Sequence, residues 1–239
     1  MPKQPQSICS PRAQAERRRR AIVGGVVGAV LVAIAVVVVI IVQTQRTSTS
    51  ATAAVPPHTT NGGNVIAVGN AAAPVTVDLY EDLQCPNCKV FEAASGPTLA
   101  KLVAAGTVQA HYHPMAFLDT PANDKYSTRA LNAAAVVVGT AGPDAFLKFH
   151  DLLYANQPSE KASGLPDSQL IAYANQAGAT GATVTKEIKD LTYGDWVKKV
   201  TDQASKDGVT GTPTVLVKGK VLADLTPAGL TAAVNAAKG

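Results

Sequence analysis

Cysteine is scarce in this chain of 239 residues, which contains only Cys9, Cys85 and Cys88. A structural zinc site needs four ligands, and Cys9 stands far upstream of the other two cysteines. His111 and His113 follow the pair, but they stand two apart on a predicted strand, which is poor spacing for completing a site with the thiols. The sequence therefore argues against zinc at the cysteine pair, and no metal is expected.

A basic stripe and internal repeats are also absent from the sequence. The formal net charge is +4, but seven of the 21 Lys and Arg and one of the 17 Asp and Glu lie in residues 1–63. Residues 64–239 thus hold 14 basic and 16 acidic residues and carry a formal charge of −2. A slightly acidic domain without clustered Lys and Arg argues against nucleic-acid binding.

A long apolar run lies near the N-terminus, where Ala21 to Val42 are all apolar or glycine. At about 1.5 Å per residue a helix of this length spans roughly 33 Å, enough for a bilayer core of about 30 Å. Arg17–Arg20 directly precede the run, which indicates that residues 1–20 form a cytoplasmic tail and residues 21–42 a transmembrane signal anchor. A signal peptide cleaved near Ala51–Ala53 is the alternative. The anchor and the cleaved signal peptide would each export the folded domain.

The segment after the apolar run, residues 43–63, is rich in Thr, Ser, Ala and Pro and is predicted to be a flexible linker. The folded domain is expected to be 64–239. Hydrophobic patterns and turn residues predict a helical insertion at about 122–190. Strands are expected at 65–68, 75–80, 108–113, 214–217 and 221–222, and helices at 87–105, 193–207 and 227–237. Without the insertion and first strand, the order β-α-β then β-β-α remains, which is the α/β thioredoxin-like fold.

Cys85-Pro86-Asn87-Cys88 stands between a predicted strand and a predicted helix, a layout typical of a thiol–disulfide redox centre. At the helix N-terminus the dipole and unpaired N–H groups stabilise a thiolate at Cys85, which is therefore the expected nucleophile. Cys88, one turn into the helix, would resolve the mixed disulfide. Pro86 suits the first turn, and Asn87 is expected to be exposed and to help set the potential. The alternative, a static disulfide, would gain little stability from so short a loop.

A second motif, Gly211-Thr212-Pro213-Thr214, places a proline directly before a predicted strand. In the thioredoxin-like fold a cis-proline loop faces the two cysteines. Thr212 would then expose its backbone N–H and C=O beside the thiols, where they can pair with an extended substrate chain.

The chain resembles the DsbA-like thiol:disulfide oxidoreductases, in particular the membrane-anchored actinobacterial type. The resemblance covers about residues 64–237 and is carried by Val75–Tyr80, Asp82–Cys88, Phe149–Tyr154 and Thr210–Thr214. It implies that Cys85 and Cys88 are the redox pair, that Pro213 is the cis-proline, and that no cofactor is needed beyond the disulfide of the pair. It also implies exported, unfolded substrate proteins with free thiols and a quinone-linked membrane partner that reoxidises the enzyme.

The sequence departs from this family at Leu79, where many relatives carry a buried acid that acts in proton transfer. Glu81 and Asp82 are the candidates for that role here, with Asp78 also nearby. In the alternative interpretation all three acids are solvated or capping residues. His150 is expected to be a packed or hydrogen-bonded histidine rather than a catalytic one.

The expected function is disulfide formation in exported proteins, by exchange with the Cys85–Cys88 disulfide on the extracytoplasmic side of the cell membrane. A lowered Cys85 pKa favours this direction, because it stabilises the reduced form of the enzyme. A reductase or isomerase on the same fold is the nearest alternative. A non-catalytic, membrane-tethered binding or chaperone module is a further one.

Overall fold

A five-stranded mixed sheet lies at the centre of the structure, a computed structural model that describes residues 53–238. The strand order is β1-β3-β2-β4-β5; β2 and β3 are parallel, and every other neighbouring pair is antiparallel. The strands are β1 (Ile66–Val68), β2 (Val75–Asp82), β3 (Val108–Met115), β4 (Thr214–Val217) and β5 (Lys220–Val221). This confirms the predicted α/β thioredoxin-like fold for the described residues.

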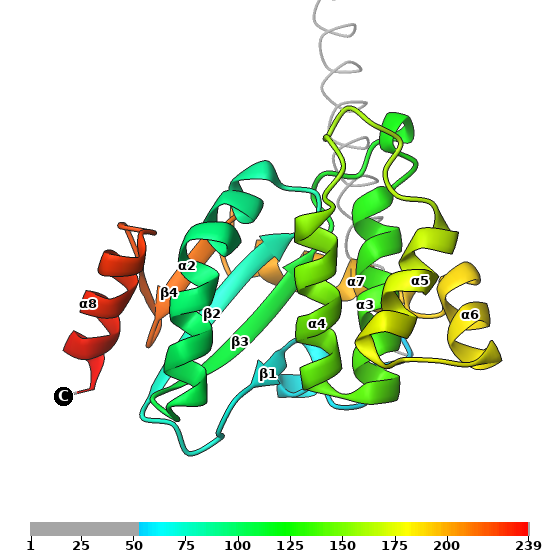
Figure 1. Cartoon of the computed structure of the whole chain (residues 1–239). Helices are drawn as coiled ribbons and strands as arrows, with labels where there is room; N and C mark the ends of the chain where they lie inside the picture. Colours follow the sequence, from blue (N-terminus) through cyan, green and yellow to red (C-terminus); the bar gives the residue numbers. More distant parts are fainter. Residues whose placement is uncertain (1–52, 239) are drawn as a thin grey trace, which may run out of the picture. The chain divides into compact units, whose positions relative to one another are not determined.

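Helices cover both faces of the sheet (Figure 1). Helices α2 and α8 pack together on one face, and α7 packs against β3 on the other. The inserted block consists of α3, α4, α5 and α6, which pack mainly on one another. The helices are α2 (Pro86–Ala104), α3 (Tyr126–Ala141), α4 (Pro143–Ala155), α5 (Asp167–Ala177), α6 (Ala182–Lys189), α7 (Gly194–Lys206) and α8 (Pro227–Ala237), with short 3₁₀ turns at Asn61–Gly63 and Pro121–Asn123.

Helix α3 forms the core of the inserted block because it has almost no polar face. From Ala130 to Val138 every residue is buried. Small and β-branched side chains let α4, α5, α6 and α7 approach α3 closely from several sides. A helix that is apolar all round belongs in a protein interior, so this sequence specifies the centre of the insertion.

The pleat of β2 sends neighbouring residues to opposite faces of the sheet. Leu79 and Glu81 point toward α2 and α4, whereas Asp78, Tyr80 and Asp82 point toward α3 and α7. All of these residues except Asp78 are buried. This alternation gives Glu81 and Asp82 different partners.

The folded domain begins earlier than residue 64, the boundary expected from the sequence. Thr60 N–H donates to Val65 O over 2.8 Å, and the buried indole of Trp196 donates to Gly63 O over 2.6 Å. The expectation of a flexible linker is therefore wrong for residues 60–63. The buried indole N–H of Trp196 requires an acceptor, and the carbonyl of Gly63 supplies it. Within residues 53–238 no helix has the length and apolarity to span a bilayer. The predicted tail and anchor, residues 1–42, lie outside the described residues.

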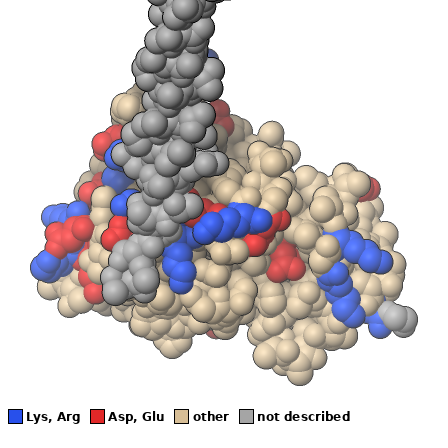
Figure 2. Space-filling model, turned by 180° about the vertical axis from the view of Figure 1, so that it is seen from behind, with Lys and Arg blue, Asp and Glu red and all other residues tan. Residues whose placement is uncertain are grey.

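The face seen from behind, opposite the view of Figure 1, carries charges of both signs (Figure 2). Lys and Arg side chains lie in small groups interspersed with Asp and Glu, and most of the surface between them is uncharged. This mixed pattern matches the near-balance of basic and acidic residues in 64–239.

Candidate active site

Strand β2 and helix α2 together position the cysteine pair. The strand ends at Asp82, and Cys85 is the N-cap of α2, with extended backbone angles and no side-chain capping bond. Pro86 is the first residue of the helix, as expected for a residue without an N–H group. Both cysteines are free thiols; Cys85 is 6% exposed and Cys88 is fully buried, whereas Pro86 and Asn87 are exposed. Cys85 is thus the thiol closer to solvent.

The Thr212–Pro213 peptide is cis, as predicted, and it lies beside Cys85. The Cys85 Sγ atom is 3.3 Å from Thr212 O, so the thiol can donate to this carbonyl across 127 positions of sequence. Thr212 and Pro213 are both partly exposed. The fold therefore brings together the Cys85–Cys88 motif and the Thr212–Pro213 motif, which lie far apart in the sequence.

The surroundings of the two thiols separate their pKa values. A hydrogen bond from the Cys88 side chain has the largest effect on Cys85 and lowers its pKa, whereas burial raises it. Hydrogen bonds from the Thr212 side chain and from the N–H groups of Cys88 and Asn87 lower it further, and the Cys85 pKa is about 6. The same bond raises the pKa of Cys88, and burial and the charge of Glu81 raise it further. At pH 7 Cys85 is mainly thiolate and Cys88 is a thiol, which is the division of labour that thiol–disulfide exchange needs.

A buried acidic cluster lies beneath Cys88, on the face of β2 that points toward α2 and α4. Glu81 Oε2 is 3.0 Å from His150 Nε2, both side chains are 3% exposed, and Glu92 of α2 completes the cluster. Burial and the charge of Glu81 raise the pKa of Glu92, so this acid is held protonated. Burial lowers the pKa of His150, but its acidic neighbours raise it to about 10. The predicted hydrogen-bonded His150 is confirmed, and Glu81 is neither solvated nor a cap.

Asp82 points the other way and organises the loops beside the thiols. Its Oδ1 accepts from Gln84 N–H (2.9 Å) and Ser127 Oγ (2.7 Å), and its Oδ2 accepts from the N–H groups of Phe117 (2.7 Å) and Leu118 (3.0 Å). Burial raises the pKa of Asp82 to about 6, against the lowering effect of these four bonds. Asp82 is therefore neither solvated nor a helix cap: it is fully buried and bonded to two loops and to Ser127 of α3, while the N-cap of α2 is Cys85.

The inserted block contributes side chains that fix the loop before Cys85. Gln157, just after α4, donates to Leu83 O (3.1 Å) and Cys85 O (3.0 Å), and Asn123 donates to Gln84 Oε1 (2.7 Å). Sequence reasoning missed Gln157, for which no local signal exists. It also missed Glu92, which could have been found, since it stands four residues after Cys88 on the same helix face.

A β-α unit that presents a Cys-x-x-Cys pair at a helix N-terminus, opposite a cis-proline, defines a protein of the thioredoxin fold. The family model described as "Thioredoxin" matches residues 60–236. The structure of reduced DsbG, a disulfide bond oxidoreductase from Mycobacterium tuberculosis, is 34% identical with a TM-score of 0.66, covering 74% of this chain and 88% of that one. Disulfide bond formation protein D of Bacillus subtilis is 30% identical over 65% of this chain and 68% of that protein.

The chain therefore belongs to the thioredoxin family, and within it to the DsbA-like thiol–disulfide oxidoreductases. Some relatives are much longer. The serine/threonine-protein kinase PknE of Mycobacterium tuberculosis is 33% identical over 132 residues, which cover 53% of this chain but 23% of the kinase. The chain thus spans about a quarter of the length of that relative.

Proposed function

We propose that this protein introduces disulfide bonds into exported proteins. The observation that carries the proposal is the pairing of Cys85, whose pKa is lowered to about 6, with a buried Cys88 whose pKa is raised. A substrate thiolate attacks Cys85 Sγ of the Cys85–Cys88 disulfide, and Cys88 leaves as a thiolate. A second substrate thiolate then attacks the substrate sulfur of the mixed disulfide, and Cys85 leaves as a thiolate. Two electrons pass from the substrate dithiol to the enzyme.

The partly exposed backbone of Thr212 supports the docking of an extended, unfolded substrate beside Cys85. Reoxidation requires an electron acceptor, and a quinone-linked membrane partner fits that need. The apolar residues 21–42 would hold the enzyme at the membrane, with its catalytic domain outside the cytoplasm. No cofactor enters these steps besides the disulfide of the pair.

Glu81 is the proposed proton partner of Cys88, in preference to Asp82. The charge of Glu81 raises the pKa of Cys88, whereas both carboxylate oxygens of Asp82 are occupied by four donors. Glu81 lies in one cluster with Glu92, which lines a groove of about 760 Å³ between α2 and α4. Protons can therefore pass between Cys88 and solvent through Glu81 and Glu92.

Glu81→Gln is expected to slow the step in which Cys88 enters or leaves the disulfide by at least about tenfold, because the proton partner is lost. The rate is measured by quenching oxidation and reduction at set times and alkylating the free thiols, from pH 5 to 9. Lys89→Gln, on helix α2 next to Cys88 but outside the cluster of Glu81, Glu92 and His150, serves as the control. An unchanged rate and pH profile in Glu81→Gln would exclude this role for Glu81.

The reduction potential tests the direction of electron flow. At pH 7 the lowered pKa of Cys85 stabilises the reduced protein by about 1.4 kcal/mol, which corresponds to about 30 mV. About 150 mV separates a strong oxidant near −120 mV from a reductant near −270 mV, so other differences between the two redox states must supply the remainder. We expect equilibration with glutathione buffers to give a value nearer to −120 mV. A value near −270 mV would favour the reductase instead.

A further inference from the structure

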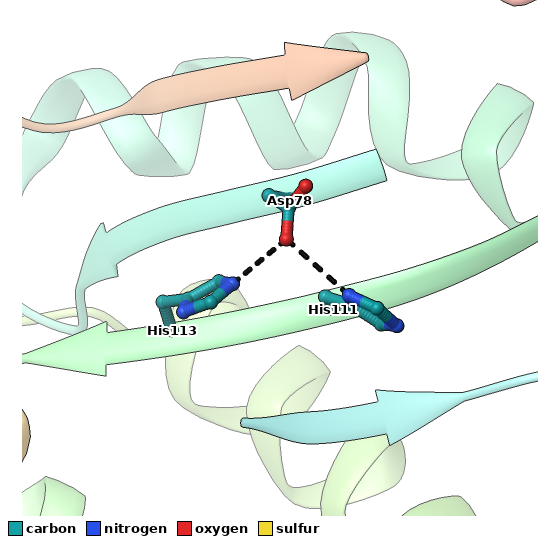
Figure 3. Close-up of side chains that lie close together, drawn as sticks. All are labelled: Asp78, His111 and His113. Atoms are coloured by element: carbon teal, nitrogen blue, oxygen red, sulfur yellow. Dashed lines mark hydrogen bonds and ion pairs between the residues drawn. The ribbon is translucent and has the colours of Figure 1, made fainter. Parts of the chain in front are cut away.

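A second cluster of polar side chains lies on the other face of the sheet from α2. Asp78 on β2 and His111 and His113 on β3 turn toward one another (Figure 3). Asp78 Oδ1 is 3.3 Å from His111 Nδ1 and 2.9 Å from His113 Nε2, and the three donor atoms all lie within 4.8 Å of one another. We propose that Asp78, His111 and His113 bind a divalent first-row transition-metal ion such as Zn²⁺.

The strand register brings these three residues to one place. In the parallel pair of β2 and β3, Asp78 is directly opposite His111, and Tyr80 is opposite His113. Because alternate residues share a face, His111 and His113 both point to the side on which Asp78 lies. The two-residue spacing of His111 and His113 does not suit a metal site shared with the cysteines. It does suit a separate metal site with the carboxylate of Asp78 on the neighbouring strand.

The two imidazoles are held in the orientation that metal binding needs. His111 Nε2 is 2.9 Å from Gln109 Oε1, and an N–H there leaves the lone pair of Nδ1 directed at Asp78. In a neutral imidazole the lone pair of Nδ1 then faces the carboxylate of Asp78, and the two repel each other. A cation bound between Nδ1 and the carboxylate would remove this repulsion. A metal-bound histidine commonly donates its other N–H to such an outer acceptor. The ring of His113 stacks on Tyr80, with centroids 4.3 Å apart and planes inclined by 15°.

The donor set identifies the class of ion. Two imidazoles and one carboxylate suit zinc and its first-row neighbours, whereas calcium and magnesium prefer oxygen ligands alone. Two ligands of a tetrahedral zinc ion lie about 3.3 Å apart, close to the two separations from Asp78 Oδ1. The side chains of Asp78, His111 and His113 are 22%, 24% and 13% exposed, so an ion can enter and a water can take a fourth position.

The test is a metal titration of the full-length chain with Cys9, Cys85 and Cys88 all replaced by serine, so that no thiolate competes for the ion. Co²⁺ is expected to bind one equivalent and give d–d absorption without a thiolate charge-transfer band. Zn²⁺ at a hundredfold excess over its dissociation constant is expected to raise the melting temperature by about 5–10 °C. Absence of both effects would overturn the proposal and leave Asp78 as a hydrogen-bond partner of the two histidines.

Variants assign the binding to these residues. His111→Ala together with His113→Ala is expected to abolish the Co²⁺ spectrum, and Gln109→Ala to weaken binding by about 10–100-fold through the outer contact. His58→Ala, at an exposed histidine outside the cluster, should bind as the parent does. Should the double variant fail to fold, protection of His111 and His113 from diethylpyrocarbonate by Zn²⁺ in the otherwise intact chain decides the question. Unprotected histidines, or Co²⁺ binding that survives in the folded double variant, would overturn the assignment.

Discussion

Replacing Cys85 with alanine is expected to abolish thiol–disulfide exchange, because the remaining thiol cannot act as the nucleophile. The bond to Cys85 that raises the pKa of Cys88 most is lost in this variant, but Cys88 lies fully buried in the fold, and burial and the charge of Glu81 still raise its pKa. A thiol with an ordinary pKa is only a few per cent thiolate at pH 7, whereas Cys85 with a pKa of about 6 is about 90% thiolate. We therefore expect exchange to fall by more than about a hundredfold.

The pKa of Cys85 is tested by alkylating the reduced protein with iodoacetamide, with Cys85→Ala as the comparison. Both proteins carry Cys9→Ser, so that Cys85 and Cys88 are the only thiols of the parent. The rate should rise about tenfold per pH unit up to about pH 6 and then level off, and Cys85→Ala should remove this reactivity. A midpoint above pH 8, or a reactive Cys88, would contradict the assignment. Because the pKa of Cys85 is lowered on folding, its thiolate stabilises the reduced fold at higher pH, and that stability is lost as pH falls through about 6.

Cys88→Ala is the companion variant, and it also tests the non-catalytic alternative. It keeps the nucleophile but has no thiol to resolve the mixed disulfide, so Cys85 should remain covalently attached to a disulfide substrate such as a glutathionylated peptide. Non-reducing electrophoresis and mass spectrometry detect this adduct, and Cys85→Ala should form none. A binding or chaperone module would retain its activity in both variants.

Local signals in the sequence were sufficient for the thiol pair and for the ends of several elements. Pro86 suits the first position of α2, where no backbone N–H is needed, and Thr226 caps α8 by accepting from Gly229 N–H. The cis peptide before Pro213 was predictable only in combination with the cysteine motif, since a lone proline seldom adopts it.

The partners of the acidic residues required the tertiary structure. Glu81 and Asp82 are adjacent in sequence, yet the pleat of β2 directs one toward His150 and the other toward Ser127. Leu79 shares the face of Glu81, so a buried acid lies on this face of β2 two residues after Leu79, nearer to the cysteines. Hydrophobic periodicity could not predict this, because both faces of the strand end are buried.

Replacing Asp82 with alanine is expected to destabilise the fold by about 3–5 kcal/mol and to lower the melting temperature by on the order of 10 °C. The carboxylate accepts four hydrogen bonds, and its loss leaves three backbone N–H groups and the Ser127 hydroxyl without their acceptor in a fully buried place. A buried donor without an acceptor costs about 1–3 kcal/mol, and entry of water can recover part of that loss. Thermal and urea unfolding at pH 7 measure the effect.

Asp195→Ala is the matched control, because Asp195 is exposed and its partner at 2.8 Å, Lys198, is exposed as well, a contact worth less than about 1 kcal/mol. Asp82→Asn should recover only part of the loss, since its amide N–H₂ group faces two donors whichever way it turns. If Asp82→Ala unfolded at the wild-type temperature but exchanged disulfides slowly, the carboxylate would act in proton transfer rather than in the architecture of the site. The four donors around it predict the opposite: lower stability, with exchange per folded molecule largely retained.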